Sequence, residues 1–395
     1  MIKASVVFFS GNIKGKLYSK LSQYFAVERD QLFLFGAGRM ALYTFLKSLD
    51  LKKPDEVIVI GYTCVVVPNA AQYLDLNISY VDIDESTLNI STEKVSAKVN
   101  SNTKVLIIAH NFGLPYNDIL SLRSKFPELI IIEDAAHTFG SIDEKGNMLG
   151  TIGHASFFSF EFSKPLTSGM GGLLIVNDKK LIESVNELHS KLKPWSIPDR
   201  FRIMKSLAVQ YITANSLLFP LRGLFVRILN AFNLSYTSSE AELRGELPKN
   251  YPVSMTNYQA SLLYHQLNEI ESINKEKADI TRKYQHAFKN FKSVRQYYVD
   301  KTVYVRYPLL INDELGTVRV EELKNDIQTV IKNPGSWFDD VIYPKGSNRC
   351  GYVEEMCPVG ESVARRIVNL PVGIHNPISD KKIKELVSVF KKYEF

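Results

Sequence analysis

The sequence contains few of the features that mark disulfide-bonded, metal-binding or nucleic-acid-binding proteins. It has only three cysteines in 395 residues, Cys64, Cys350 and Cys357, and their spacing fits neither a zinc knuckle nor a disulfide scaffold. The net charge of +6 is dispersed without a long run of lysine or arginine, so we expect no nucleic-acid partner. No internal repeat, low-complexity tract or secretory signal is visible, and a reducing cytoplasm is the expected location.

A hydrophobic run able to cross a membrane is also lacking, although one stretch comes near to it. Residues 206–221 carry no charge, and the apolar character continues to residue 232, with only Arg222 and Arg227 interrupting it. Several polar residues and Pro220 argue against a bilayer span. Two interpretations stay open. The stretch is either a pair of helices buried at a subunit interface, or an amphipathic patch that contacts anionic lipid and places the protein peripherally on a membrane.

The composition is that of a globular protein, 45% apolar and 23% charged, in a chain long enough for two domains. Up to about residue 178, short apolar runs alternate with helical stretches such as 39–49 and 66–73. This alternation predicts an α/β domain with a mainly parallel sheet covered on both faces. The predicted strands are 32–35, 57–60, 78–83, 105–109, 130–132 and 173–176.

The last third of the chain predicts a smaller α+β domain. One long helix is expected over 256–291, because apolar residues recur there at helical spacing. Strands at 304–311 and 366–370 and helices at 319–331 and 380–393 are expected to follow it. We therefore place a large domain at 1–250 and a small one at 251–395.

Lys164 is the first candidate for a chemically active group. It lies in FFSFEFSKPLTSGMGG (157–172), among four phenylalanines and before a glycine cluster. Burial disfavours the charged form of an amine and makes its lone pair available for nucleophilic attack. Asp134 almost directly follows the apolar strand 129–132, at the strand end where α/β sheets bind ligands. A Schiff-base lysine and a carboxylate for the pyridinium nitrogen are the two groups that pyridoxal phosphate (PLP) requires.

The motif Gly36-Ala37-Gly38-Arg39-Met40-Ala41 follows a predicted strand and opens a helix. It matches the dinucleotide-binding pattern, but the next strand ends in Gly61-Tyr62-Thr63 without the acid that would bind a ribose hydroxyl. Two interpretations of the motif remain. It is either a phosphate site at a helix N-terminus or a plain strand-to-helix turn. The hydroxyl of Ser159 could donate to a phosphate oxygen or to a nearby carbonyl. His137 is either a ligand-facing residue or a core histidine.

The order of the motifs GAGRMAL, EDAAHTFGS, FFSFEFSKPLTSGMGG, MTNYQASLL and CPVGESVARRIVNLPVG resembles that of the DegT/DnrJ/StrS sugar aminotransferases. This resemblance implies the fold of type I PLP enzymes. It implies that Lys164 bonds the cofactor, that Asp134 pairs with its ring nitrogen and that His137 lies beside its phenolic oxygen. It also implies that Ser159 and the backbone of Gly38 and Arg39 hold the phosphate.

The chain departs from the family pattern at several positions. Cys64 stands where an aromatic residue often stacks on the pyridine, so either Tyr62 replaces that ring or the cofactor is held more loosely. Pro252 and Ser254 stand where Asn and Arg usually reach the partner subunit's site. Arg39 replaces a small threonine, and it either supplies compensating positive charge or is an exposed surface arginine. The segment 195–245 looks like an apolar insertion.

The resemblance implies a homodimeric transaminase that transfers an amino group from an amino acid, glutamate, to a nucleotide-linked keto-sugar, in surface polysaccharide or secondary-metabolite sugar biosynthesis. Lysine rather than histidine at position 164 favours transamination over sugar dehydration. Two alternatives remain. The apolar stretch 206–232 would suit a lipid-linked or membrane-associated substrate, and a non-catalytic regulator could bind PLP or a sugar on the same fold.

Overall fold

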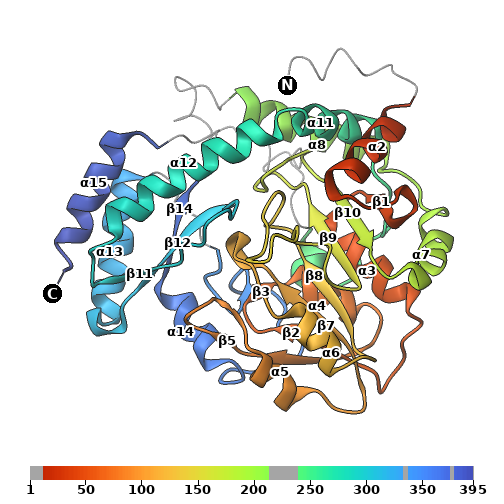
Figure 1. Cartoon of the computed structure of the whole chain (residues 1–395), viewed down its shortest axis with the longest axis horizontal. Helices are drawn as coiled ribbons and strands as arrows, with labels where there is room; N and C mark the ends of the chain where they lie inside the picture. Colours follow the sequence, from red (N-terminus) through yellow and green to blue (C-terminus); the bar gives the residue numbers. More distant parts are fainter. Residues whose placement is uncertain (1–11, 213–238, 332–336, 374–377, 395) are drawn as a thin grey trace.

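The computed structural model describes residues 12–212, 239–331, 337–373 and 378–394. A seven-stranded sheet forms its centre, in the order β1-β10-β9-β8-β7-β2-β4 (Figure 1). The neighbouring pairs from β9 to β4 are parallel, and β10 and β1 add antiparallel at one edge. The predicted, mainly parallel sheet is therefore confirmed. Its strands are β1 (Leu32–Phe35), β2 (Glu56–Ile60), β4 (Asn77–Val81), β7 (Thr103–Ala109), β8 (Ile130–Asp134), β9 (Ala155–Ser159) and β10 (Gly172–Val176).

Helices cover both faces of this sheet, because successive strand residues point to opposite sides. Val57 and Val59 pack in one core with residues of α3, α4 and α7, whereas Ile58 and Ile60 pack on the other face with residues of α5, α6 and the C-terminal part. The helices concerned are α3 (Gly38–Ser48), α4 (Val66–Gln72), α5 (Thr92–Lys98), α6 (Ile119–Lys125) and α7 (Ile182–His189).

A third core lies against the antiparallel edge. Leu34 of β1 and Leu173 of β10 pack there with α2 (Ile13–Phe25) and α11 (Asn257–Leu267). Before α11 the chain forms α8 (Ile197–Ile212) and the short α10 (Glu240–Leu243).

The single helix expected over 256–291 is wrong, because the chain forms α11 and then α12 (Ile270–Phe288). At the break, the backbone N–H groups of Asn268 and Glu269 donate to carbonyls only three residues back, which tightens the turn. Leu267 and Ile270 on either side are both buried, so the apolar spacing continues across the break and hides it in the sequence.

The predicted smaller α+β unit is present. Its antiparallel sheet has the order β11-β12-β14, and α12, α13 and α15 pack beside it (Figure 1). The elements are β11 (Val294–Gln296), β12 (Arg306–Ile311), α13 (Thr317–Val330), α14 (Pro358–Arg366), β14 (Ile367–Pro371) and α15 (Asp380–Lys391). Two small pairs join β13 (Ile342–Tyr343) to β3 (Thr63–Cys64) and β5 (Ile83–Asp84) to β6 (Asn89–Ile90). The boundary at residue 250 stays a prediction.

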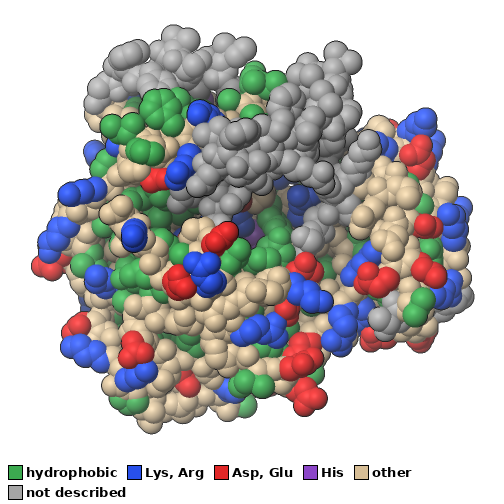
Figure 2. Space-filling model, turned by 180° about the vertical axis from the view of Figure 1, so that it is seen from behind, with side chains coloured by type: hydrophobic (Ala, Val, Ile, Leu, Met, Phe, Trp, Pro, Cys, Tyr) green, Lys and Arg blue, Asp and Glu red, His purple; other side chains and the backbone are tan. Residues whose placement is uncertain are grey.

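Basic and acidic side chains are interspersed over the described part of the face shown in Figure 2, as the dispersed charge of the sequence predicts. Among the residues that the structure describes, no helix has the length and apolar character needed to cross a bilayer. Most of the apolar stretch 206–232 lies outside the described residues, which end at residue 212 and resume at residue 239.

Candidate active site

Asp134 is the last residue of β8, at the carboxyl edge of the parallel strands. Its side-chain Oδ1 accepts a hydrogen bond from the backbone N–H of Ala136 (3.0 Å). Burial raises the pKa of Asp134, and this hydrogen bond and the positive charge of Lys164 oppose that rise. A further positive charge beside this carboxylate would therefore favour its ionised form.

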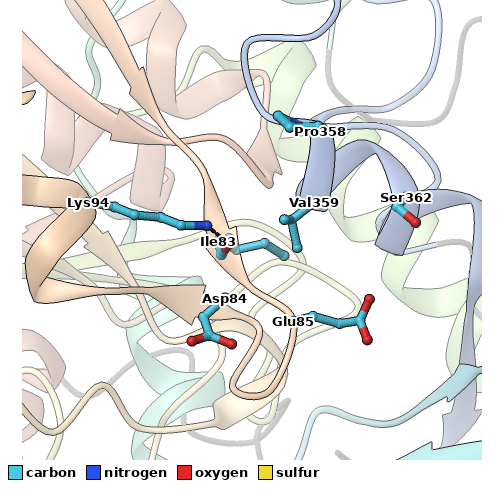
Figure 3. A pocket seen from close by; sticks show the side chains of 7 residues that line it. All are labelled: Ile83, Asp84, Glu85, Lys94, Pro358, Val359 and Ser362. Carbon is cyan, nitrogen blue, oxygen red and sulfur yellow. Dashed lines mark hydrogen bonds between the residues drawn. The ribbon is translucent and has the colours of Figure 1, made fainter.

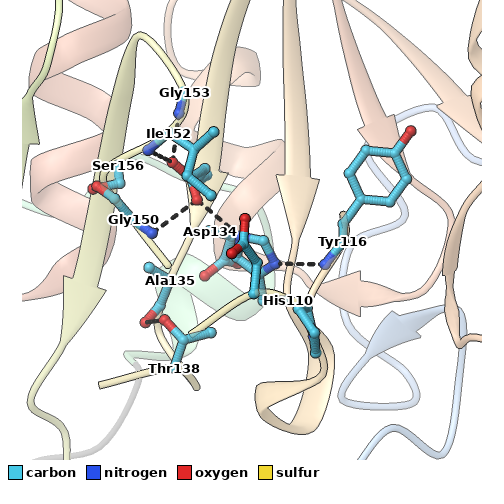
Figure 4. A network of polar contacts seen from close by, with 12 residues as sticks. His110, Tyr116, Asp134, Ala135, Thr138, Gly150, Ile152, Gly153 and Ser156 are labelled. Carbon is cyan, nitrogen blue, oxygen red and sulfur yellow. Dashed lines mark hydrogen bonds and ion pairs between the residues drawn. The ribbon is translucent and has the colours of Figure 1, made fainter. Parts of the chain in front are cut away.

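A buried network fixes this strand end (Figure 4). Glu133 is fully enclosed, and its carboxylate accepts hydrogen bonds from the backbone N–H groups of Gly150 (2.8 Å), Ile152 (2.7 Å) and Gly153 (2.6 Å). The same carboxylate is 3.0 Å from Nε2 of His110. Because Nδ1 of His110 accepts the backbone N–H of Tyr116 (3.1 Å), a neutral His110 carries its proton on Nε2 and donates it to Glu133.

Sequence reasoning treated Glu133 only as a spacer before Asp134. The usable signal was an acid that directly continues an apolar strand, since such an acid is buried and must find several donors. The structure shows that it holds the loop 150–153 against the end of β8.

Lys164 lies in the loop between β9 and β10, which begins and ends at the sheet. Phe160 closes this loop, because its N–H donates to the carbonyl of Gly171 (2.9 Å) and its carbonyl accepts the N–H of Ser168 (3.0 Å). Gly169 has φ +82°, a conformation that disfavours any side chain. Burial lowers the pKa of Lys164, while the negative charges of Glu161 and Asp134 oppose that shift.

His137 is buried three residues beyond Asp134. Its Nδ1 accepts the backbone N–H of Phe112 (3.1 Å), so in the neutral ring Nε2 carries the proton and is a donor. Burial, followed by the charge of Lys164, keeps the pKa of His137 well below its usual value. The ring is therefore neutral at physiological pH and can donate a hydrogen bond without carrying a charge.

An aromatic ring that the sequence reasoning missed completes this cluster. The indole of Trp337 stacks on His137 with centroids 4.9 Å apart and planes 7° apart, and Nζ of Lys164 lies 4.7 Å from the indole centroid. Tyr62, expected as a possible replacement ring, is fully enclosed and donates its hydroxyl to the carbonyl of Phe338 (3.4 Å). Its replacement of the stacking ring stays a prediction. No motif surrounds Trp337 in the sequence, so only tertiary packing identifies it.

The N-terminus of α3 meets the end of β9. A Cβ atom on Gly38 would lie 2.8 Å from the carbonyl oxygen of Phe158 and 3.1 Å from Cβ of Ser159, and one on Gly172 would lie 2.5 Å from the nitrogen of Gly38. Only glycines permit this approach. Gly38 and Ser159 thus lie together beside the backbone N–H groups of the first turn of an eleven-residue helix, a favourable place for a phosphate.

Arg39 is not the exposed arginine that the simpler expectation described. Its guanidinium forms an ion pair with Oε1 of Glu242 (2.8 Å), and the two side chains are only 11% and 6% exposed. The pair ties α3 to α10, so much of the charge of Arg39 is neutralised. The charge of Arg39 also acts on Cys64. Burial raises the pKa of the Cys64 thiol, and the positive charges of Arg39 and Lys164 oppose this rise.

The segment with Pro252 and Ser254 runs along β1 of the same chain. The carbonyl of Val253 accepts the N–H of Gly36 (2.8 Å), and the N–H of Ser254 donates to the carbonyl of Lys193 (2.9 Å). Neither Pro252 nor Ser254 carries an amide or a guanidinium side chain, so neither can make the contacts that the resemblance predicts from those positions.

A separate cavity of about 360 Å³ lies between β5, α5 and α14 (Figure 3). Its polar side chains already have partners. Glu85 pairs with Arg366 (2.5 Å) and Arg295 (3.2 Å), and Lys94 donates to the carbonyl of Ile83 (2.5 Å). Neither Lys164 nor Asp134 lines it, so we place the chemistry at the carboxyl edge of the sheet.

Comparison with known proteins supports the fold and identifies the family. The chain is 28% identical over 363 residues to the uncharacterized protein MJ1066 of Methanocaldococcus jannaschii, which covers 89% of this chain and 82% of that protein. It is 34% identical over 174 residues to the GDP-perosamine synthase of Escherichia coli O157:H7, which covers 43% and 47%. The PLP form of the sugar aminotransferase Spr1654 from Streptococcus pneumoniae has the same fold, with a TM-score of 0.72, 18% identity, and coverage of 97% and 91%.

The family model of the DegT/DnrJ/EryC1/StrS aminotransferases matches residues 5–196 and 227–391. Because this match covers most of the sequence, the chain belongs to the DegT/DnrJ/EryC1/StrS aminotransferase family.

Proposed function

We propose that this protein is a PLP-dependent transaminase that moves an amino group from glutamate to a nucleotide-linked keto-sugar. One observation carries the proposal: Lys164 and His137 contact the same Trp337 ring beside the end of β8, and the charge of Lys164 acts on both Asp134 and His137. Family membership and the names of relatives, such as GDP-perosamine synthase, support a nucleotide sugar as the acceptor.

The residues present fit PLP. The buried amine of Lys164 suits a covalent bond to its carbonyl carbon, and the carboxylate of Asp134 suits a protonated ring nitrogen. The glycine-lined N-terminus of α3 and the hydroxyl of Ser159 suit its phosphate. When bound, PLP would supply a ring that accepts the electron pair released when a bond at the amino carbon breaks.

The residues around that ring have separate tasks. Asp134 would keep a proton on the ring nitrogen, since a carboxylate beside it favours the charged form. Nε2–H of His137 would donate to the phenolic oxygen. Nζ of Lys164 would take a proton from the α-carbon of the donor and return it to the cofactor carbon that is bonded to the same nitrogen. Its lowered pKa suits this role, because a base must be partly unprotonated.

The first test is the visible absorption spectrum of the protein purified with PLP. We expect a band that glutamate bleaches, and we expect Lys164→Ala to abolish both the band and its bleaching. Lys104→Ala, at a surface lysine of β7 whose Nζ donates to the carbonyl of Ser101 (2.9 Å), is the control and should behave as the wild type. A wild-type protein without the band would refute the cofactor assignment.

The second test identifies the acceptor. Nucleotide-linked 3-keto and 4-keto sugars are incubated with the enzyme and ¹⁵N-glutamate, and mass spectrometry detects the amino sugar. Transfer of the label to one of them is the expected result. A regulator without catalytic activity would show the absorption band but neither bleaching nor labelled product.

One structural feature favours the lipid-linked alternative as a second candidate. Helix α8 exposes apolar side chains, with Ile197 66% and Phe201 57% exposed, next to the exposed Arg200 and Lys205. Co-sedimentation with anionic vesicles compares the wild type with an Ile197→Asp/Phe201→Asp variant. Equal partitioning of the two would exclude the lipid-linked substrate. We also propose a homodimer and a cytoplasmic location, the former to be checked by light scattering.

A further inference from the structure

The geometry points to a carboxylate-binding site formed by Arg306, beside Trp337 and Lys164 of the same chain, that takes the carboxylate group of the amino donor. The inference rests on the proposed function, because it assigns the group that recognises one of its two substrates.

The segment before Arg306 docks directly on the candidate active site. The backbone N–H of Val303 donates to Oγ of Ser141 (2.9 Å), in the loop after β8, and the N–H of Val305 donates to the carbonyl of Phe112 (3.2 Å), after β7. Arg306 then begins β12, where it is paired with Pro371 of β14. The small sheet therefore brings Arg306 to the carboxyl edge of the large one.

Trp337 joins Arg306 to Lys164. The guanidinium carbon of Arg306 lies 5.7 Å from the centroid of the indole, and Nζ of Lys164 lies 4.7 Å from it. The side-chain amide of Asn369 on β14 donates to the carbonyl of Trp337, so the indole is anchored to the small sheet. Both cations thus contact the same aromatic ring, which is a favourable contact for each of them.

Helix α12 adds a further cation behind Arg306. Lys277 is only 4% exposed, and its Nζ donates to the carbonyl of Tyr304 (3.3 Å). Burial, together with the charge of Arg306, lowers the pKa of Lys277 to about 8. The hydroxyl of Tyr284, on the same helix, donates to the carbonyl of Pro371 (3.0 Å). Arg306 and Lys277 are therefore close enough for the charge of Arg306 to act on Lys277, which the negative charge of Glu276 opposes.

A carboxylate fits this position better than the diphosphate of a nucleotide sugar. In an amino acid the carboxylate is bonded to the carbon that carries the reacting amine, so it must lie close to Lys164. In a nucleotide sugar the atoms of the sugar ring separate the diphosphate from the carbonyl carbon. Arginine also offers parallel N–H donors that match the two oxygens of a carboxylate.

The experiment measures the half-reaction with glutamate alone, followed by the bleaching of the visible band, for wild type, Arg306→Met and Arg306→Lys. Arg295→Met, on β11 of the same sheet, is the control because Arg295 is largely exposed and pairs with Glu85. We expect the dissociation constant for glutamate to rise about 10- to 100-fold in Arg306→Met, less in Arg306→Lys and not at all in the control. Each variant must first show the wild-type band.

A second arm separates a binding role from a structural one. Wild type should react faster with glutamate than with butylamine, which has no carboxylate, and Arg306→Met should lose that preference. Inhibition by uridine diphosphate should be the same in both proteins. Unchanged glutamate affinity in Arg306→Met, or a loss of uridine diphosphate affinity alone, would overturn the inference. If Arg306→Met does not fold, unchanged glutamate affinity in Arg306→Lys would overturn it. Absence of the band in the wild type would instead refute the proposed function.

Discussion

Glu133→Gln tests whether the buried network below Asp134 holds the sheet edge. The carboxylate accepts four hydrogen bonds, two at each oxygen: Ile152 and Gly153 at Oε1, Gly150 and His110 at Oε2. A glutamine has only one acceptor oxygen, so whichever way it is oriented, two buried donors face an NH₂ group. His110 cannot adapt by moving its proton, because Nδ1 is already an acceptor for Tyr116.

Each buried donor left without an acceptor costs about 1–3 kcal/mol, so the substitution should cost roughly 2–6 kcal/mol. That is a large part of the ~5–15 kcal/mol by which most proteins are stable. Thermal unfolding followed by circular dichroism measures the effect, with Glu128→Gln, at an exposed acid just before β8, as the control. Equal melting temperatures for the two variants would refute the reasoning. We also expect Glu133→Gln to retain less PLP, since Asp134 is its neighbour.

Three further predictions concern the phosphate end, the ion pair and the pH dependence. Gly38→Ala would place a methyl group 2.8 Å from the carbonyl oxygen of Phe158, so PLP should dissociate at least about tenfold faster. Unchanged PLP retention would contradict the close approach of α3 to the end of β9. Glu242→Gln removes the negative charge that pairs with the buried Arg39, at a cost of about 3–5 kcal/mol. Glu240→Gln on the same helix, at an exposed acid, should leave the melting temperature nearly unchanged, and equal losses would contradict this. His137 is neutral when folded, but below its usual pKa of about 6.5 the unfolded chain binds a proton there, so stability should fall as pH drops through 6.5. His137→Gln should reduce that fall in urea midpoints between pH 7.5 and 5.5, and an identical fall would contradict the shift.

The parts of the molecule that the sequence predicted are those in which local pattern decides structure. Six of the seven strands of the large sheet were predictable because apolar residues predominate in them, as in strands covered on both faces. β9, with serines at its second and last positions, was not among the predicted strands. Asp134 does lie at the end of β8, as the apolar run before it indicates. The break between α11 and α12 was not predictable, since buried residues lie at helical spacing on both sides of it.

The missed residues depend on contacts between distant parts of the chain. Arg39 meets Glu242 only through the docking of α10 on α4 and α3, so its burial is not visible in the residues around it. Trp337 likewise reaches His137 only because the chain returns from the small sheet to the large one. Local spacing carries no information about such contacts, whereas burial and distance in the folded chain identify them.

The departures from the family pattern do not involve Lys164 or Asp134. Lys164 and Asp134 come from the large sheet and retain the groups that PLP requires, whereas Cys64 and Ser254 lack the side chains expected at their positions. Trp337 and Arg306, the ring and the cation near Lys164, come from the C-terminal part of the chain. Substitutions among the site residues of the large sheet need not disturb those of the C-terminal part, because different elements hold the two sets. Changes at Lys164 should thus abolish the reaction itself, while changes at Arg306 should alter which donor is used, and this difference is the most direct test of how the site is divided.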